Sequence, residues 1–351
     1  MNELIQMALR LAREGDLPDE QLARLIAERD AETAKCLAKE AREVQNRFYG
    51  KKIFVRGLIE LSSYCKNDCY YCGIRRSNRL AERYRLDEET ILACCKAGYE
   101  LGFRTFVLQG GEDGWYTDDK ICHIVASIRN RYPDCAITLS IGEKSRESYR
   151  RYREAGADRY LLRHETATDA HYRMLHPKEL SFANRMRCLQ DLKELGYQTG
   201  CGFMVGAPGQ TVEHLVRDLR FLKEFNPQMV GIGPFIPHKE TPFAGEKAGS
   251  VELTVYLLSI IRLMLPQVLL PATTALGSIC RDGREQGILA GANVIMPNLS
   301  PEDVRGKYLL YNNKLHTGSD AAENKRLLEK QMLAIGYEVV TARGDYPVRE
   351  S

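Results

Sequence analysis

Residues 53–73 read IFVRGLIELSSYCKNDCYYCG, an apolar strand that runs directly into a loop with three cysteines. Cys65, Cys69 and Cys72 have the spacing CxxxCxxC. Thiolates are soft ligands that suit zinc or iron-sulfur clusters, and structural zinc sites almost always have four protein ligands. The next cysteines along the chain lie in an amphipathic, helix-like segment, so no fourth ligand stands nearby. Three cysteines would leave one iron of a four-iron cluster open to a small molecule, and a zinc knuckle or a zinc-stabilised scaffold without catalytic activity is the alternative.

After this strand, short apolar segments alternate with helix-length segments. Eight strands are expected, at residues 53–62, 105–111, 136–142, 159–165, 199–206, 229–236, 269–275 and 293–298. Helices are expected between them, among others at 87–102, 145–156, 181–196, 211–225 and 251–265. Several of these segments end in a glycine, where a left-handed C-cap is expected. These glycines are Gly102, Gly156 and Gly196. Eight such units predict an α/β fold, a closed (β/α)8 barrel of the TIM type, with an open doubly wound sheet as the alternative.

The two ends of the chain depart from this alternation. Residues 1–50 have helical periodicity, which predicts two helices ahead of a barrel formed by residues 51–300. Residues 301–351 contain a charged helical segment at 319–336. We expect this last region to form a C-terminal helical extension that caps the bottom or the rim of the barrel.

The composition argues against several classes of protein. The 351 residues are 44% apolar and 28% charged, as in a globular domain. The net charge is +3 and no basic block with interleaved aromatics occurs, so nucleic-acid binding is not expected. Arg262, Pro266 and Pro271 interrupt the longest apolar region, which argues against a membrane span. Early charges at the N-terminus argue against a secretory segment, so the eleven cysteines are expected to be reduced in a cytoplasmic protein.

Polar residues stand where the predicted strands end, which is where a barrel of this type places its chemistry. They include Gly110, Gly111 and Glu112, Ser140, Arg163 and Glu165, and Thr273 and Thr274. Paired glycines let a main chain approach a ligand closely. Arginine offers a planar fork to carboxylates, and an ionised glutamate accepts from two hydroxyls. The threonine pair suits an anion or a carboxylate, and Thr138 and Tyr308 could complete such a pocket.

Each of these residues also has a purely structural interpretation. The glycine pair could form a plain β-turn, and Arg163 and Glu165 could form a buried structural pair. Arg185 could be a solvated helix charge. Threonine in a strand often reflects β propensity alone.

The cysteine loop resembles the cluster-binding loop of the radical S-adenosylmethionine (SAM) superfamily. Tyr71 matches the aromatic residue before the last cysteine, and LQGGED at 108–113 resembles the GGE element that meets the SAM ammonium. RYLLRHETA at 159–167 and GIGPFIPH at 231–238 are similar to the HydE family of FeFe-hydrogenase maturases, a likeness that runs from about residue 50 to 300. Methylornithine synthase and biotin synthase have a similar architecture and are the alternatives.

The resemblance implies one 4Fe-4S cluster on the three cysteines, with SAM on the open iron and reductive cleavage of SAM to a 5′-deoxyadenosyl radical. The implied SAM-site residues are Tyr71, Gly110, Gly111, Glu112, Ser140, Glu165, Arg185 and Met229. The implied catalytic residues are Arg163 and Tyr308, and the implied substrate-binding residues are Thr138, Thr273, Thr274 and Tyr311.

The substrate implied by the family is an organometallic small molecule. The radical would attack the sulfur of a cysteine-bound iron carbonyl cyanide complex during assembly of the diiron subcluster of the hydrogenase. The implied protein partners are other hydrogenase maturases and an electron donor. No cysteine follows Cys280, so the second cluster that some family members carry is expected to be absent.

Overall fold

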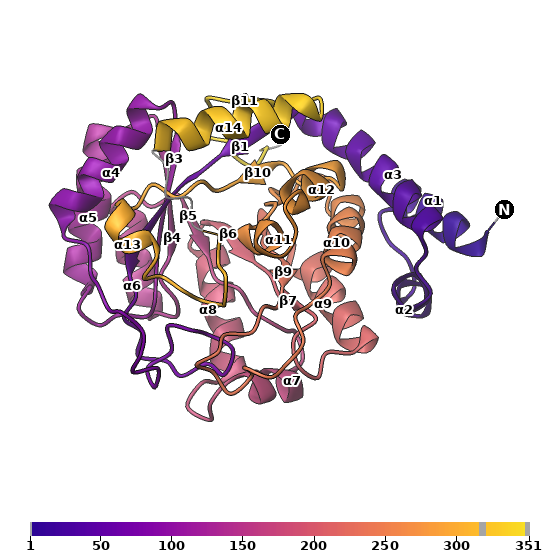
Figure 1. Ribbon diagram of the computed structural model, residues 1–351, viewed down its shortest axis with the longest axis horizontal. Helices are drawn as coiled ribbons and strands as arrows, with labels where there is room; N and C mark the ends of the chain where they lie inside the picture. The colour runs from indigo at the N-terminus through magenta and orange to yellow at the C-terminus, as the bar shows by residue number, and fades with distance from the viewer. Residues whose placement is uncertain (1, 316–320, 348–351) are drawn as a thin grey trace.

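Six parallel strands form the continuous part of the sheet in the described chain, in the order β2-β3-β4-β5-β6-β8 (Figure 1). Their bounds are β2 Gly57–Ser62, β3 Thr105–Gly110, β4 Ala136–Ser140, β5 Arg159–Leu161, β6 Gln198–Cys201 and β8 Met229–Val230. The computed structural model describes residues 2–315 and 321–347. The strands are almost entirely buried, as expected for a parallel sheet that is covered by helices.

Short bridges close this sheet into a barrel. Met229 of β8 bridges Leu269, and Pro271 bridges β10 (Val294–Ile295). The strand β10 pairs in parallel with β1 (Lys52–Val55), which continues along the chain into β2. Because the circuit returns to the first strand, the predicted (β/α)8 barrel is confirmed.

Helices follow the strands and surround the barrel. Their bounds are α4 Glu88–Glu100, α5 Asp118–Arg131, α6 Arg146–Glu154, α7 Asp169–Leu175, α8 Phe182–Glu194, α9 Val212–Phe225, α10 Val251–Met264, α11 Thr274–Ile279 and α12 Gly283–Leu289. The side chains of Asp87, Ser145 and Thr211 accept hydrogen bonds from main-chain N–H groups of the helices that they precede. These caps satisfy donors that the helix itself leaves unpaired, and they explain where the helices begin.

Several predicted strands are interrupted in the structure. The segment 53–62 is divided at Arg56 into β1 and β2. Likewise, 199–206 is divided into β6 and β7 (Met204–Val205), and 229–236 into β8 and β9 (Gly233–Pro234). At the break between β6 and β7, a Cβ on Gly202 would overlap the carbonyl oxygen of Gly231, so the two main chains approach too closely for regular pairing. The expected strand 269–275 is extended only at its start, because α11 begins at its end.

Residues 2–49 form three helices rather than the expected two. They are α1 Glu3–Glu14, α2 Asp19–Ala27 and α3 Ala31–Tyr49. The third begins at Asp30, whose side chain accepts a hydrogen bond from the main chain of Thr33 at 2.7 Å. The helix α3 packs against α1 and α10. The three helices α1, α2 and α3 project to one side of the barrel (Figure 1). None of the described helices is long and apolar enough to cross a membrane.

The C-terminal region covers the N-terminal ends of the barrel strands. After α13 (Glu302–Arg305) and α14 (Ala321–Ala334), β11 (Glu338–Val340) pairs with β1 (Figure 1). The buried Arg159, at the start of β5, donates to the carbonyls of Arg343 and Gly344, each at 3.0 Å, and to Asp345 at 2.7 Å. The chain thus closes the barrel bottom with a buried cation and an acidic partner.

This closure predicts a loss of stability in acid. Partial burial raises the pKa of Asp345, but the hydrogen bond from Arg343 and the charge of Arg159 outweigh it and lower this pKa from 3.8 to about 2. A lowered pKa in the folded state stabilises the fold above 3.8, and the contribution is lost as the pH falls toward 2. We expect Asp345→Asn to unfold at lower urea concentration at pH 7 and to lose less stability between pH 4 and pH 2. Asp119→Asn, which removes an exposed partner of Arg151, is the control. Parallel profiles for Asp345→Asn and the wild type would contradict this role.

Candidate functional site

The three cysteines lie in the loop after β2, and the loop after β3 rests on them. The main-chain N of Glu112 donates to Sγ of Cys65 at 3.3 Å, and its carbonyl accepts from the main chain of Lys66 at 2.9 Å. Gly111 lies so close to the cysteine loop that a Cβ would overlap the carbonyl oxygen of Tyr64. The glycine therefore serves the contact between the two loops and is more than a turn residue.

Electrostatics at the cysteines favour a bound cation. Burial raises the pKa of the Cys72 thiol to about 12, and the neighbouring Cys65 adds to the effect. Burial likewise raises the pKa of Cys65 and that of Cys69, and for Cys69 the neighbouring Cys72 and Cys65 add to the effect. Metal ligation requires thiolates, so iron would have to supply the compensating positive charge. In residues 2–315 and 321–347, no three His, Cys, Asp or Glu side chains are grouped to hold a single metal ion. Three partly buried thiols in one loop suit an iron-sulfur cluster that takes one thiolate per iron.

Glu112 presents its carboxylate beside this loop. One carboxylate oxygen accepts from the main chain of Glu143 at 2.8 Å, and the other lies 3.2 Å from Nζ of Lys66. Lys66 is mostly exposed whereas the Glu112 side chain is buried. The carboxylate is therefore held in place by the main chain and is already paired with an ammonium group.

A second group of charges lies at the end of β5. Arg185 of α8 is buried, with Nε 2.5 Å from a carboxylate oxygen of Glu143 and Nη1 donating to the carbonyl of Arg163 at 2.5 Å. The solvated interpretation of Arg185 is therefore wrong. Nη2 of Arg163 lies 2.9 Å from a carboxylate oxygen of Glu165, but in an orientation that makes no hydrogen bond. Nη2 of Arg163 and Oε2 of Glu165 are therefore buried atoms that make no hydrogen bond with any described residue.

Glu165 has an unusual main-chain conformation, with φ at +66°. This left-handed region is unfavourable for a residue with a side chain, so neighbouring groups must hold it. The main chain of Glu165 donates to Gly202 at 3.0 Å, and the main chain of Gly202 donates to Nδ1 of His164 at 3.2 Å. Nε2 of His164 then carries the proton and lies 3.3 Å from Asp218. Asp218 also accepts from the main chain of Ala167 at 2.5 Å.

Removing the Asp218 carboxylate should therefore loosen the segment around Glu165. We expect Asp218→Ala to lower the free energy of unfolding by about 2 kcal/mol, because it leaves the partly buried Ala167 N–H without its acceptor and removes the carboxylate beside His164. Urea unfolding measures this loss. Arg217→Ala, an exposed change on the same helix, should stay within about 0.5 kcal/mol of the wild type. Equal stability of the two variants would show that Asp218 does not support the segment.

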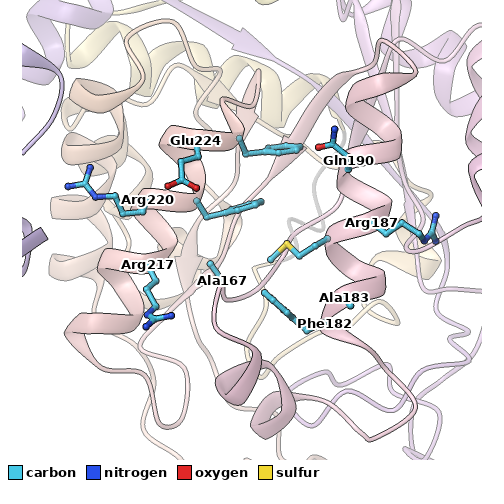
Figure 2. A pocket seen from close by; sticks show the side chains of 11 residues that line it. Ala167, Phe182, Ala183, Arg187, Gln190, Arg217, Arg220 and Glu224 are labelled. Atoms are coloured by element: carbon cyan, nitrogen blue, oxygen red, sulfur yellow. The ribbon is translucent and has the colours of Figure 1, made fainter.

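A groove of about 630 Å³ lies between α8 and α9, outside the barrel (Figure 2). Its lining includes Ala167, Phe182 and Phe221. None of the residues predicted for the site lines it. The ring of Phe221 contacts His164 at a centroid distance of 4.7 Å, so the groove borders the back of the segment that holds Glu165.

Polar atoms without partners gather inside the barrel. The buried atoms that make no hydrogen bond within the described structure include Oγ1 of Thr138, Oγ1 of Thr273, Nε and Nη2 of Arg163, Oε2 of Glu165 and Nε of Arg284. Buried polar groups are nearly always hydrogen-bonded in folded proteins. Several buried donors and acceptors without a partner among the described residues therefore favour a polar ligand in the barrel.

Three further predicted residues lie at this end of the barrel. Thr274 begins α11, close behind Thr273. Tyr311 lies within electrostatic range of Arg284 and Arg163. The buried Tyr308 accepts a hydrogen bond from the amide of Gln109 at 3.4 Å. The main chain of Gly73, after the last cysteine, donates to Leu310 at 2.8 Å, so the segment of Tyr308 and Tyr311 lies against the cysteine loop, whereas Thr138 lies within β4 opposite Arg159.

Two of the remaining predicted residues are also near the cysteines. The hydroxyl of Tyr71 lies 3.1 Å from Nε2 of His176, and its ring is within electrostatic range of Glu165 and Cys69. Ser140 ends β4 opposite Gln109 of β3. Tyr71 lies within the cysteine loop, and Ser140 lies at the C-terminal end of its strand.

Met229, predicted to line the SAM site, is buried in the wall of the barrel. It is the first residue of β8 and lies opposite Gly200, deep in the barrel. Its sulfur is 3.0 Å from Nη1 of Arg56, in the layer above the bottom closure. Its contact with SAM stays a prediction.

Sequence reasoning missed several charged residues of the site. Lys314 forms a buried ion pair with Glu60, whose other oxygen accepts from Asn298 at 2.9 Å. Arg56 is buried with two nitrogens unpartnered within the described residues. The signal was available for Glu60 and Arg56, because a charge inside a near-continuously apolar strand must face a partner or a ligand.

Comparisons with known proteins agree with this geometry. The model of the radical SAM superfamily matches residues 59–222. The chain is 49% identical to the FeFe-hydrogenase maturase subunit HydE of Thermotoga maritima, over 80% of this chain and 80% of that protein. The chain belongs to the HydE family of radical SAM enzymes. Enzymes of the radical SAM superfamily use a 4Fe-4S cluster and SAM, which fits the buried thiols and the Glu112 carboxylate of this family member.

The chain is also similar, at lower identity, to methylornithine synthases. A 3-methylornithine synthase of Methanosarcina acetivorans is 32% identical over 82% of this chain and 81% of its own. The crystal structure of methylornithine synthase PylB has a TM-score of 0.83 with this chain at 26% identity, covering 95% of this chain and 97% of its own. The shared barrel thus extends beyond the HydE family, whereas the higher identity is to HydE.

Proposed function

We propose that this protein matures FeFe-hydrogenase by cleaving SAM and using the resulting radical on a cysteine-bound iron carbonyl cyanide precursor. The observation that carries the proposal is the cysteine loop, in which three partly buried thiols stand together and Cys65 contacts the Gly111–Glu112 turn at the mouth of a barrel. The identity of 49% to HydE supports this assignment over that of a methylornithine synthase.

Within the proposal, Cys65, Cys69 and Cys72 hold the cluster. When bound and reduced, the cluster supplies the electron that splits SAM into methionine and a 5′-deoxyadenosyl radical. The main-chain contacts of Glu112 hold its carboxylate ready for the SAM ammonium, in place of Lys66. Glu165 is suited to accept from ribose hydroxyls, and Arg185 holds Arg163 and Glu143 in position.

The interior of the barrel is suited to a substrate with negative charge. Arg163 and Arg284 each bring buried nitrogens without hydrogen-bond partners in the described chain. We also assign to the substrate site Thr138 and Thr273, whose hydroxyl groups make no hydrogen bond with any described residue. An iron complex that carries cyanide and a cysteine carboxylate offers acceptors for these donors. Residues 308–314, held by the Glu60–Lys314 pair, help to exclude water from a reactive carbon radical.

The proposal includes partners and a place in the cell. The product would pass to other hydrogenase maturases through transient contacts, and an electron donor must reduce the cluster. The eleven cysteines are all free, as in a protein that works in a reducing compartment such as the cytoplasm. We include residues 1–50 and 301–351 in the working enzyme as helical support and barrel cap.

Release of 5′-deoxyadenosine from SAM tests the proposed substrate. The reconstituted, dithionite-reduced protein would be incubated with the cysteine-bound iron carbonyl cyanide complex, with free cysteine, or with lysine. We expect stimulated release with the iron complex only, and activation of apo-hydrogenase when the other maturases are added. Stimulation by lysine alone would instead identify a mutase of the methylornithine synthase type, and no stimulation by any of the three would refute the proposal.

A further inference from the structure

Large apolar side chains are exposed around the cysteine loop. Leu80 is 74% exposed, and Tyr64 and Trp115 are 37% and 41% exposed. Tyr64 directly precedes the first cysteine, and Trp115 follows the Glu112 turn. Side chains of this kind are enriched in protein interfaces, and the role proposed above gives none of them a task.

Arginines connect these apolar side chains into one surface. The guanidinium of Arg85 lies 3.8 Å from the ring centre of Tyr64 and 5.8 Å from that of Trp115. Arg83 donates to the carbonyls of Ser63 and Asn78, which ties the turn before Leu80 to the strand before Tyr64. The surface is therefore continuous along the outer side of the cysteine loop.

The charge of this region is strongly positive. Residues 64–85 contain six cationic and two acidic residues, a formal charge of +4, whereas the whole chain carries +3. Asp68 is paired with Arg75, and Lys66 and Arg85 are paired with Glu112 and Asp113 from outside this stretch, so the unpaired positive charge lies on the arginines between them. The exposed side chains of Arg76 and Arg79 make no ion pair or hydrogen bond with any described residue. A concentrated positive field with unpaired arginines attracts a partner of opposite charge.

The surface also lies next to the buried cluster ligands. The main chain of Arg76 donates to the carbonyl of Asn67 at 2.8 Å, within the cysteine loop itself. A protein that covers Tyr64 and Arg76 would therefore be separated from the cluster only by this loop. That closeness suits electron transfer more than the delivery of a substrate, which needs the open mouth of the barrel.

We propose that Tyr64, Arg76, Arg79, Leu80, Arg85 and Trp115 form the docking surface for a small acidic electron-transfer protein. The inference rests on the proposed function, because that function requires one electron for each SAM cleaved. At this step one electron leaves the reduced flavin or iron-sulfur centre of the partner, which is oxidised, and the cluster of this protein is reduced. No covalent bond changes in the transfer between the two proteins.

The double variant Arg76→Glu/Arg79→Glu tests the surface. Release of 5′-deoxyadenosine would be measured with reduced flavodoxin, with reduced ferredoxin and with dithionite. We expect about a tenfold slower rate with an acidic protein donor at low salt, a smaller difference at high salt, and an unchanged rate with dithionite. Arg326→Glu/Lys330→Glu, which reverses two exposed cations of α14, is the matched control and should keep the wild-type rate with every donor.

Leu80→Ser provides a second test that does not depend on charge. We expect slower reduction by the protein donor at both low and high salt, because an apolar contact is lost. Wild-type rates for both variants with both protein donors would overturn the docking surface. A rate that falls equally with dithionite would place the defect in the site rather than in docking. Failure of the wild-type protein to cleave SAM even with dithionite would refute the proposed function itself.

Discussion

Replacing Cys69 with alanine should abolish cluster binding and SAM cleavage while the barrel stays folded. Cys69 lies in a loop at the barrel mouth and belongs to none of the buried apolar clusters of the described residues. Two thiolates cannot hold the three irons that require protein ligands, so the loss should be essentially complete. Iron and sulfide content, 5′-deoxyadenosine release and the circular dichroism of the variant would be measured together.

Cys280→Ala is the matched control for this experiment. Cys280 is a free thiol near α12, and its sulfur lies 2.9 Å from Asp282, outside the cysteine loop. We expect full iron content and full activity for this variant. Global unfolding of Cys69→Ala, or retention of iron and sulfide at the wild-type level, would show that the loop has a different role.

Replacing Arg163 with alanine should leave the cluster intact and greatly reduce turnover of the substrate. Its buried Nε and Nη2 make no hydrogen bond with a described residue, and its carbonyl is already held by Arg185. The main-chain contact would therefore survive the substitution, whereas the donors to the substrate would be lost. We expect substrate turnover to fall by about 100-fold or more, as when other preorganised donors are removed.

The conservative variant and a surface variant make this result specific. Arg163→Lys keeps the charge but not the planar fork, so partial activity is expected. Arg173→Ala removes an exposed arginine of α7, whose partner is Asp169, and should have no effect. Unchanged turnover in Arg163→Ala would remove Arg163 from the substrate site.

Much of the barrel could be predicted because burial leaves a direct signal. Strands that are covered on both faces read as apolar runs, and helices begin at capping residues such as Ser145 and Thr211. The polar residues after those runs then had to lie at one mouth, because parallel strands end on the same side. For this reason Arg163, Glu165 and Thr273 were predicted together from separate parts of the sequence.

Other features depend on contacts between segments far apart in the chain. The break between β6 and β7 depends on a main-chain approach of Gly202 to Gly231, which no local pattern reveals. The burial of Arg185 depends on Glu143 from another strand end. Residues 319 and 320, the first two of the helical segment predicted at 319–336, lie outside the described residues.

Electron paramagnetic resonance of the reconstituted, dithionite-reduced protein tests the central claim most directly. The spectrum would be recorded without and with SAM. We expect the signal of a reduced 4Fe-4S cluster whose g values shift when SAM is added, because SAM binds the iron that the three cysteines leave open. The absence of a cluster signal, or a signal indifferent to SAM, would contradict the assignment of Cys65, Cys69 and Cys72 to a SAM-binding cluster.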